Sequence, residues 1–383
     1  MSDRAPSCQV TYQVDYQVTI GAPDRDALPR LWQSLEARAT PNFFLSWLWV
    51  DAWLTTFNPE CRLVQIQCDS VLVGLGLLTC NEEIRHRILR SRMLRLGRTG
   101  NAVQDQIWIE YNGLLLDRQH EHSAPAALLQ QLLQQDDWDE FELGASDAAV
   151  LQRYAHPDCT AIIRWSAPAY GVNLAALREA KTDYLASLSR NTRYQINRSR
   201  KLYAADATLT FSTHTAPDAI LNLWPQLADL HRARWGNAPG QSGFANDAFV
   251  RFHQHLIRHG GADDRVELCT LHRNDELLGC LYNFLYKGRV YFYLSGLRAE
   301  TDPHLKPGLL LHAMAIQHYL ERHYDYYDFM GGEARYKQSL GNQHCELQLV
   351  SFQRPRLKLK LEQLARRIKH LTPDKQSTDD HQQ

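Results

Sequence analysis

The sequence predicts a protein of the α/β class, more narrowly α+β, in which a chain of 383 residues folds into two related units. Each unit is expected to be a mixed, mostly antiparallel sheet flanked by helices. Three observations lead to this fold class. The chain is long enough for two domains of ordinary size. The run Val266–Met330 has the pattern strand, strand, strand, helix, strand. Parts of the same order recur in the first half of the chain.

The C-terminal unit begins with an antiparallel meander. Its three strands are separated by Arg273-Asn274-Asp275 and by Lys287-Gly288, which are typical of tight turns. An apolar helix begins at Pro307-Gly308, because the missing N–H of proline has no partner at the first helical position anyway. A last strand ends at Gly331-Gly332. The predicted strands are Val266–Leu271, Glu276–Tyr286, Val290–Gly296 and Tyr324–Met330, and the helix runs from Pro307 to about Arg322.

The first half repeats this order in three collinear blocks, although any two α/β units share some features at this level. Pro125-Ala126 stands where the second copy has Pro307-Gly308. A methyl group at the start of a helix narrows the approach of a phosphate to the backbone. We therefore expect the second copy to bind the ligand and the first to be a degenerate partner. The matching blocks are Leu63–Leu78 with Glu267–Phe284, Ser123–Leu133 with Leu305–Ala315, and Asp139–Ser146 with the segment from Tyr327 to Ala334.

The remaining elements fill the two units in order. Strands are expected where apolar residues alternate, and helices where they recur every three to four residues. The predicted strands are Gln9–Ile20, Leu63–Gln67, Val71–Leu78, Gln106–Leu116 and Glu140–Leu143, and the helices are Pro29–Ala39, Phe43–Phe57, Ala124–Gln135, Asp183–Ala205, Ala216–Arg234 and Phe249–His259. We place an N-terminal degenerate domain at 1–175, a C-terminal catalytic domain at 176–353, and a basic amphipathic helix with a disordered tail at 354–383.

Composition excludes several classes of function. The net charge of −1 gives no global electrostatic case for nucleic acid or for an anionic membrane. The eight cysteines lack CxxC spacing, and we interpret them as reduced thiols of a cytoplasmic protein. No signal peptide or membrane span is visible. The sequence has no HExxH motif, and no metal site is expected.

Six collinear blocks in the second half resemble the CelD-like (cellulose-biosynthesis-associated) family of the GNAT acyltransferase superfamily, which is related to the Fem-type aminoacyl transferases. The blocks are LSRNTRYQINRSRKL (Leu188–Leu202), LHRARWG (Leu230–Gly236), ELLGCLYNF, GRVYFYLSG, KPGLLLHAMAI and YDFMGGEARYKQSLG. The resemblance implies tandem GNAT-like domains and an acyl-CoA co-substrate, with no permanently bound cofactor. Of the family's phosphate loop, Gln/Arg-x-x-Gly-x-Gly/Ala, only Pro307-Gly308 remains.

Transfer of an acyl group to an amine requires a base, donors for the developing oxyanion and a donor for the leaving thiolate. For the base, Glu333 is the first choice and His231 the second; an exposed carboxylate and a packed histidine are the competing interpretations. The candidate acids are Tyr293 and Tyr336. The expected cofactor-binding residues are Ser295, Gly296, Pro307, Gly308 and Leu309, and the expected substrate-binding residues are Arg193, Arg234, Trp235, Asn283 and Lys337.

The predicted function is therefore an acyl-CoA-dependent N-acyltransferase that transfers an acyl or acetyl group to the amine of a small molecule or amino sugar, in polysaccharide biosynthesis. Two alternatives stay open. One is a Fem-like transferase that uses aminoacyl-tRNA, and the other is a non-catalytic GNAT-fold component of a polysaccharide or envelope assembly. The basic helix after Arg354 either packs on the domain or docks on a partner or a membrane surface. Nucleic acid is not an expected partner.

Overall fold

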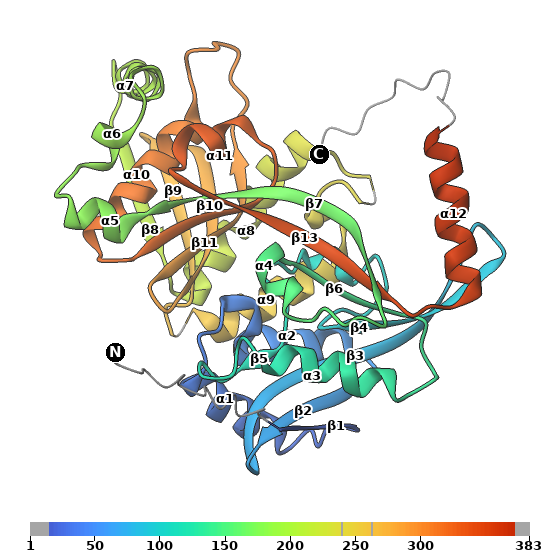
Figure 1. Ribbon diagram of the computed structural model, residues 1–383. Helices are drawn as coiled ribbons and strands as arrows, with labels where there is room; N and C mark the ends of the chain where they lie inside the picture. Colours follow the sequence, from blue (N-terminus) through green and yellow to red (C-terminus); the bar gives the residue numbers. More distant parts are fainter. Residues whose placement is uncertain (1–14, 239, 262, 372–383) are drawn as a thin grey trace, which may run out of the picture.

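One continuous sheet of 13 strands forms the frame of the molecule (Figure 1). The computed structural model describes residues 15–238, 240–261 and 263–371, without the side chains of 365–371. The strand order is β1-β2-β3-β4-β6-β13-β7-β12-β11-β10-β9-β8, and β5 pairs with β3 off this path. No helix in the described ranges is long and apolar enough to cross a membrane. The predicted residues 9–14 and 372–383 lie outside the described part.

The N-terminal half supplies the first seven strands. Its elements are β1 (Tyr16–Gly21), α1 (Leu28–Arg38), α2 (Trp47–Phe57), β2 (Arg62–Cys68), β3 (Val71–Arg85), β4 (Leu89–Leu96), β5 (Leu115–Leu116), α3 (Ala124–Leu133), β6 (Glu140–Asp147), α4 (Ala148–Gln152) and β7 (Thr160–Asn173). The strand predicted over Gln106–Leu116 is wrong. Residues 105–107 form a 3-10 turn, the backbone is left-handed at Trp108 and Tyr111, and only Leu115–Leu116 is extended in the sheet.

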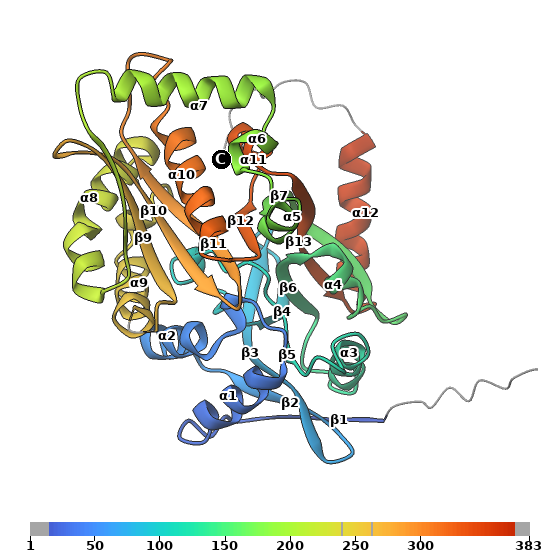
Figure 2. The ribbon, with the colours of Figure 1, turned by 90° about the vertical axis from the view of Figure 1, so that its left-hand side faces the viewer.

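The C-terminal half repeats this order. Its elements are α5 (Leu174–Glu179), α6 (Tyr184–Ser187), α7 (Arg190–Tyr203), β8 (Leu209–His214), α8 (Pro217–Trp235), α9 (Asp247–Gly260), β9 (Val266–Arg273), β10 (Glu276–Tyr286), β11 (Arg289–Leu297), α10 (Pro307–Glu321), β12 (Tyr326–Gly331), α11 (Arg335–Leu340), β13 (Gln343–Gln353) and α12 (Leu357–Leu371). Helices α8 and α9 cover one face of β9–β11, and α7 and α10 cover the other (Figure 2).

The predicted tandem arrangement is confirmed by the matching order of the two halves. In each half the third meander strand pairs in parallel with the strand after the proline-led helix: β4 with β6, and β11 with β12. One feature differs from the expectation of two separate sheets. Strand β7 of the first half pairs with β12, β13 of the second half pairs with β6, and β7 and β13 pair with each other over their whole length. The halves therefore exchange their last strands and share one sheet.

Strand β10 is apolar at most positions because both of its faces are buried. Cys280, Tyr282 and Phe284 belong to the core beneath α8 and α9, while Leu281 and Leu285 belong to the core beneath α10. Side chains of a strand alternate between the two faces of a sheet. Because helices cover both faces, the buried positions of this strand are apolar apart from Asn283, whose amide donates to the Tyr319 hydroxyl.

Candidate functional site

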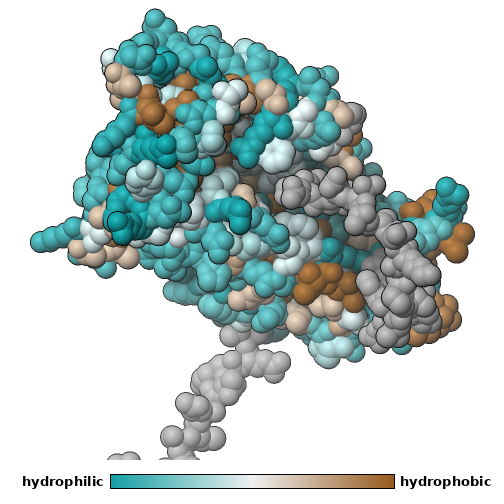
Figure 3. Space-filling view, turned by 90° about the horizontal axis from the view of Figure 1, so that it is seen from above, coloured by the Kyte–Doolittle hydropathy of each residue, from teal (hydrophilic) through white to brown (hydrophobic). Residues whose placement is uncertain are grey.

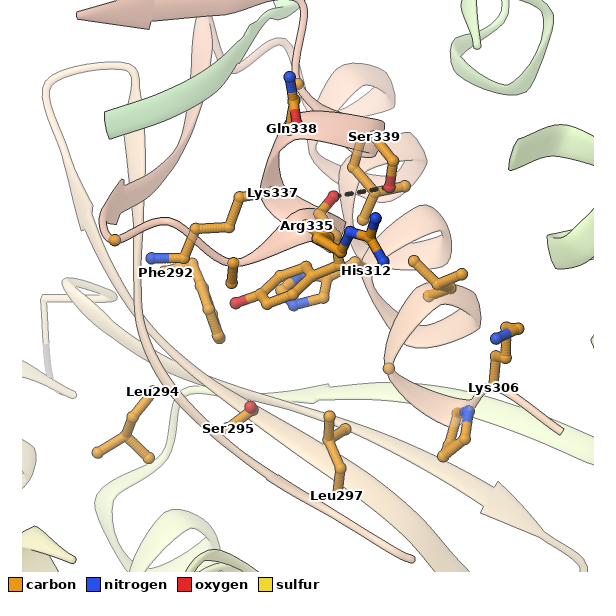
Figure 4. Close-up of a pocket in the computed structure, with 18 of the residues that line it drawn as sticks. Phe292, Leu294, Ser295, Leu297, Lys306, His312, Arg335, Lys337, Gln338 and Ser339 are labelled. Atoms are coloured by element: carbon orange, nitrogen blue, oxygen red, sulfur yellow. Dashed lines mark hydrogen bonds between the residues drawn. The ribbon is translucent and has the colours of Figure 1, made fainter. Parts of the chain in front are cut away.

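A cavity of 1620 Å³ opens where β11 and β12 separate. Their parallel ladder ends at the pair Tyr291–Asp328, and the rest of β11 has no partner on its β12 side within the described residues. Figure 4 shows Leu294, Ser295 and Leu297 along β11 on one side of the cavity, and His312, Arg335 and Lys337 on the other. The starts of α7 and α10 and the end of α8 complete the wall.

The start of α10 faces this cavity without a side-chain cap. Lys306 occupies the N-cap position, Pro307 begins the helix, and no side chain accepts a hydrogen bond from its first turn. A methyl group on Gly308 would lie 2.8 Å from the Leu297 side chain, so glycine allows β11 and α10 to approach closely here. Free N–H groups and the positive end of the helix dipole favour an anion at this point.

The charges on the cavity wall favour an anionic ligand. Five cationic side chains line the cavity, whereas Glu333 is the single carboxylate among its described lining residues. The chain as a whole carries a net charge of −1, so cations are concentrated at this site. A positive, concave wall raises the local concentration of anions. The five cations are Arg234, Arg298, Lys306, Arg335 and Lys337.

Most of the residues expected from the sequence line this one cavity. They are Glu333, His231, Tyr293, Tyr336, Ser295, Pro307, Gly308, Leu309, Arg234, Trp235 and Lys337. Of these, Glu333 is exposed, and the Arg234 guanidinium lies 5.2 Å from the ring centre of Trp235. Three expected residues do not line the cavity: Gly296, Arg193 and Asn283.

Physical reasons explain these three exceptions. Gly296 packs against α8, where a methyl group would lie 2.8 Å from the carbonyl oxygen of Leu227. The Arg193 guanidinium turns away and donates to the carbonyl of Ala186 at 3.1 Å. Asn283 is fully buried beneath α10 and donates to the Tyr319 hydroxyl at 2.9 Å.

His231 is held as a neutral side chain at the end of α8. Its Nδ1 lies 2.8 Å from the Ser242 hydroxyl. Burial, reinforced by the charges of Arg234 and Arg232, lowers the pKa of His231 to about 4. A group with this pKa is a weak acceptor for the proton of an amine. The candidate role of His231 as a base therefore loses support in favour of a carboxylate.

The two candidate acids differ in their partners. The Tyr293 hydroxyl donates to the backbone carbonyl of Ile107, so its proton is already engaged. Tyr336 stacks on the buried His312 ring, with 5.3 Å between ring centres. Burial raises the pKa of both tyrosines above the ordinary value, which keeps both hydroxyls protonated. Both tyrosines line the cavity, and the role of either as an acid stays a prediction.

Lys337 is a buried cation beneath the end of β12. Its ammonium donates to the carbonyls of Met330 and Gly331, the former at 3.3 Å. Burial lowers the pKa of Lys337, and the charges of Glu110 and Asp328 oppose that effect. These contacts fix the ammonium at the cavity wall.

Sequence reasoning missed Glu110, which the N-terminal half brings to the same place. One of its carboxylate oxygens accepts a hydrogen bond from the backbone N–H of Gly331 at 2.8 Å, across a sequence separation of 221 residues. Burial raises the pKa of Glu110 to about 7, although the Gly331 hydrogen bond and the Lys337 charge both act to lower it. No spacing or motif marks this residue, because its partner is so remote in the sequence.

Trp108, from the same loop, was also missed. Its backbone is left-handed, with φ 42°, and its partly exposed ring lines the cavity. The ring centre lies 5.4 Å from that of Phe249 and 6.4 Å from that of Tyr293. The N-terminal half therefore contributes the Trp108 side chain to the wall of a cavity that lies mainly in the C-terminal half.

At the corresponding helix start in the N-terminal half, a tyrosine of β1 contacts the N-cap residue. The Tyr16 hydroxyl of β1 contacts Ser123, the N-cap residue of α3, and lies 3.0 Å from Nδ1 of His120. Pro125 is buried and Ala126 is exposed. Neither α3 nor α10 has a side-chain cap, and the degenerate character of the first copy stays a prediction.

Comparison with known proteins supports the assignment of the C-terminal half. Residues 190–338 match the family model of the acetyltransferase (GNAT) domain. The chain therefore carries a GNAT acetyltransferase domain over this range, and the narrower CelD-like assignment stays a prediction. None of the curated proteins matches the sequence.

Solved structures share the whole fold. FemX superimposes with a TM-score of 0.56 and 10% sequence identity, covering 88% of this chain and 98% of FemX. A conserved protein of unknown function from Bacteroides thetaiotaomicron superimposes with a TM-score of 0.52 and 12% sequence identity. The match covers 89% of this chain and 100% of that protein. L-PGS from Bacillus licheniformis superimposes with a TM-score of 0.51 and 11% sequence identity, covering 88% of this chain and 96% of L-PGS. At these identities the likeness concerns the fold alone.

Proposed function

We propose that this protein is an acyl-CoA-dependent N-acyltransferase that moves an acyl group, acetyl in the simplest case, to the amine of a small molecule or amino sugar. The single observation that carries the proposal is the cavity between β11 and β12, with the uncapped start of α10 at its wall. The matched GNAT domain covers all of these elements. The cytoplasm is the proposed compartment, and the seven described cysteines, all free thiols, support it.

In the proposed binding mode the diphosphate of the acyl-CoA lies at the start of α10. Its charge is balanced by Lys306 and by the helix N–H groups beside Gly308. The pantetheine arm follows β11 past Ser295, and the thioester lies between β11 and the Gly331–Gly332 end of β12. The acceptor amine then enters from the side of Trp108 and His231, which line the same cavity.

In the proposed reaction the amine nitrogen attacks the thioester carbon, the C–S bond breaks and an amide forms. Glu110 receives the amine proton through a bridging water, since its pKa of about 7 suits a base at neutral pH. Lys337 stabilises the developing negative charge. The leaving thiolate takes a proton from Tyr336. Glu333 remains the competing candidate for the base, because it lines the cavity directly.

Binding of acetyl-CoA tests the proposal through the start of α10. We expect acetyl-CoA to raise the melting temperature, by the equivalent of about 2.7 kcal/mol at a hundredfold excess over Kd. Gly308→Trp should abolish this shift, because a side chain at this position begins against Leu297 and an indole there separates β11 from α10 at the proposed phosphate position. Ala126→Trp is the matched control, since it changes the corresponding exposed position of α3, outside the cavity, and should leave the shift intact.

A second variant separates misfolding from lost binding. Lys306→Glu changes a partly exposed side chain and should weaken acetyl-CoA binding at least about tenfold, with a reduced dependence on salt. No thermal shift with acetyl-CoA or longer acyl-CoA would contradict the proposal. Binding of aminoacyl-tRNA instead would favour the Fem-like alternative, and binding of neither donor would favour a non-catalytic role.

A further inference from the structure

Helix α12 is held firmly against the rest of the protein by its inner side. Leu359 is 1% exposed, and the buried Glu362 carboxylate lies 3.2 Å from the Arg85 guanidinium and 3.3 Å from His86. The Lys358 ammonium donates to Asp139 at 2.6 Å. These contacts attach the first two turns of α12 to the hairpin formed by β3 and β4 and to the residue before β6.

The outer side of the same helix presents large aliphatic groups to solvent. Leu357, Leu361 and Leu364 are 73%, 57% and 54% exposed. Residues at this spacing lie on one face of a helix. On the neighbouring hairpin Ile84 is 57% exposed and Ile88 85% exposed. Figure 3 shows apolar side chains at the edge of the molecule that carries these elements. We call these five side chains the aliphatic edge.

Basic residues surround the aliphatic edge. The sequence of α12 contains five Lys and Arg residues and one acid, Glu362, which is turned inward and paired. Arg354 and Arg356 precede the helix and pair with Asp136, and the exposed Arg87 lies at the hairpin tip beside Ile88. The remainder of the chain is net acidic, because the total charge is −1. The helix that carries the exposed leucines is therefore a net positive segment of a chain that is otherwise net acidic.

We propose that the aliphatic edge docks on the surface of an anionic lipid bilayer. Leucine and isoleucine side chains enter the boundary between headgroups and acyl chains, and the surrounding Lys and Arg bind anionic headgroups. Charge complementarity favours a lipid surface over a second copy of this chain, because the basic surroundings of two copies would repel each other. The contacts of Glu362 and Lys358 fix the helix on the protein, so docking brings the whole enzyme to the membrane.

Sedimentation of the full chain with vesicles tests this inference. Vesicles with about 30% phosphatidylglycerol in phosphatidylcholine should bind the protein, and pure phosphatidylcholine vesicles should bind it at least about tenfold more weakly. Binding should fall as the salt concentration rises, because ionic strength screens the attraction between exposed charges. The double variant Leu361→Asp, Leu364→Asp should lose binding by at least about tenfold.

Leu202→Asp is the matched control, since Leu202 is a 40% exposed leucine on the distant helix α7. It should bind vesicles like the unchanged protein, and both variants should keep the far-UV circular dichroism of a folded chain. Equal binding to both kinds of vesicle, or undiminished binding of the double variant, would overturn the proposal. So would self-association without lipid that the double variant abolishes, because the edge would then be a contact between copies.

Discussion

The carboxylate of Glu110 and the ammonium of Lys337 converge on the backbone at Gly331, one from each half of the chain. Burial dominates the titration of Glu110 and raises its pKa to about 7, while the Lys337 charge acts in the opposite direction. A carboxyl group that titrates near neutral pH beside a cavity is a candidate for acid–base chemistry. The charges of Glu110 and Asp328 oppose the effect of burial on Lys337, which helps to keep a lysine in so buried a position.

The pH dependence of acylation tests the role of Glu110. If its carboxylate is the base, kcat/KM should rise as the pH passes through about 7 and then level off, because only the deprotonated form accepts a proton. Glu110→Gln should remove this limb and lower kcat/KM by roughly 10² to 10⁴. Glu333→Gln is the comparison variant. Loss of the limb in Glu333→Gln, with Glu110→Gln unaffected, would assign the base to Glu333.

The raised pKa of Glu110 also predicts how the stability of the Glu110→Gln variant depends on pH. The pKa of Glu110 rises from 4.5 to about 7 on folding, so the protonated carboxyl favours the folded state. This contribution to the free energy of unfolding is fully present below about pH 4.5 and is lost as the pH rises through about 7. Glu110→Gln, which stays neutral, should therefore gain on the order of 1 to 3 kcal/mol at pH 8 and little at pH 4. Urea unfolding at the two pH values measures the difference.

At the scale of elements, a loop of the first half forms part of the site of the second. Alternation in the sequence predicted a strand over Gln106–Leu116, but the segment turns at Trp108 and Tyr111. The Arg289 guanidinium packs 5.4 Å from the Tyr111 ring centre and pairs with Asp328 at 3.0 Å. Contacts with the second half thus overrode the local preference for an extended chain.

Trp108→Ala tests the contribution of this loop. The ring lines the acceptor side of the cavity, away from α10 in the proposed binding mode. Its removal should raise the KM for the amine several-fold and leave acetyl-CoA affinity unchanged, because the phosphate contacts are untouched. Steady-state kinetics with each substrate varied in turn makes the comparison. An equal loss of acetyl-CoA affinity would mean that Trp108 supports the whole cavity and not the acceptor side.

The elements that the sequence predicted well are those with a strong local pattern. The strand Glu276–Tyr286 and the helix start at Pro307 have the predicted bounds. The helix start lies at the cavity as expected, and so do Lys337 and His231. Asn283 does not, because strand periodicity says that a side chain faces one side or the other without saying what covers each side. The site roles of these residues remain predictions until the variants are measured.

At the scale of the whole molecule, the exchange of β7 and β13 makes the two halves interdependent. Cutting the chain at the predicted boundary after residue 175 would leave β12 without β7 and β6 without β13. The hydrophobic core also contains residues of both halves. The Phe43 and Phe284 rings stack with 4.2 Å between their centres, and the ring centres of Trp49 and Phe252 lie 4.7 Å apart. The two halves repeat the same order of strands and helices, but they pack as a single folded unit.

Unfolding should therefore be a single cooperative event. We expect urea transitions followed by tryptophan fluorescence and by far-UV circular dichroism to coincide. Fragments 1–175 and 176–353, made separately, should be poorly soluble, because each exposes unpaired strand edges. Two separated transitions, or a folded and soluble fragment 176–353, would show that the C-terminal half is independent of β7.

The sequence by itself determined the repeated order of strands and helices, the start of α10 at Pro307-Gly308, and the amphipathic character of the C-terminal helix. These features depend on side-chain periodicity and turn chemistry, which act over a few residues. Only the tertiary structure decided that the halves share one sheet, that Glu110 meets Gly331, and that leucines of α12 face solvent. Such contacts join residues that are far apart in the sequence, and no local pattern records which distant surface a segment will meet.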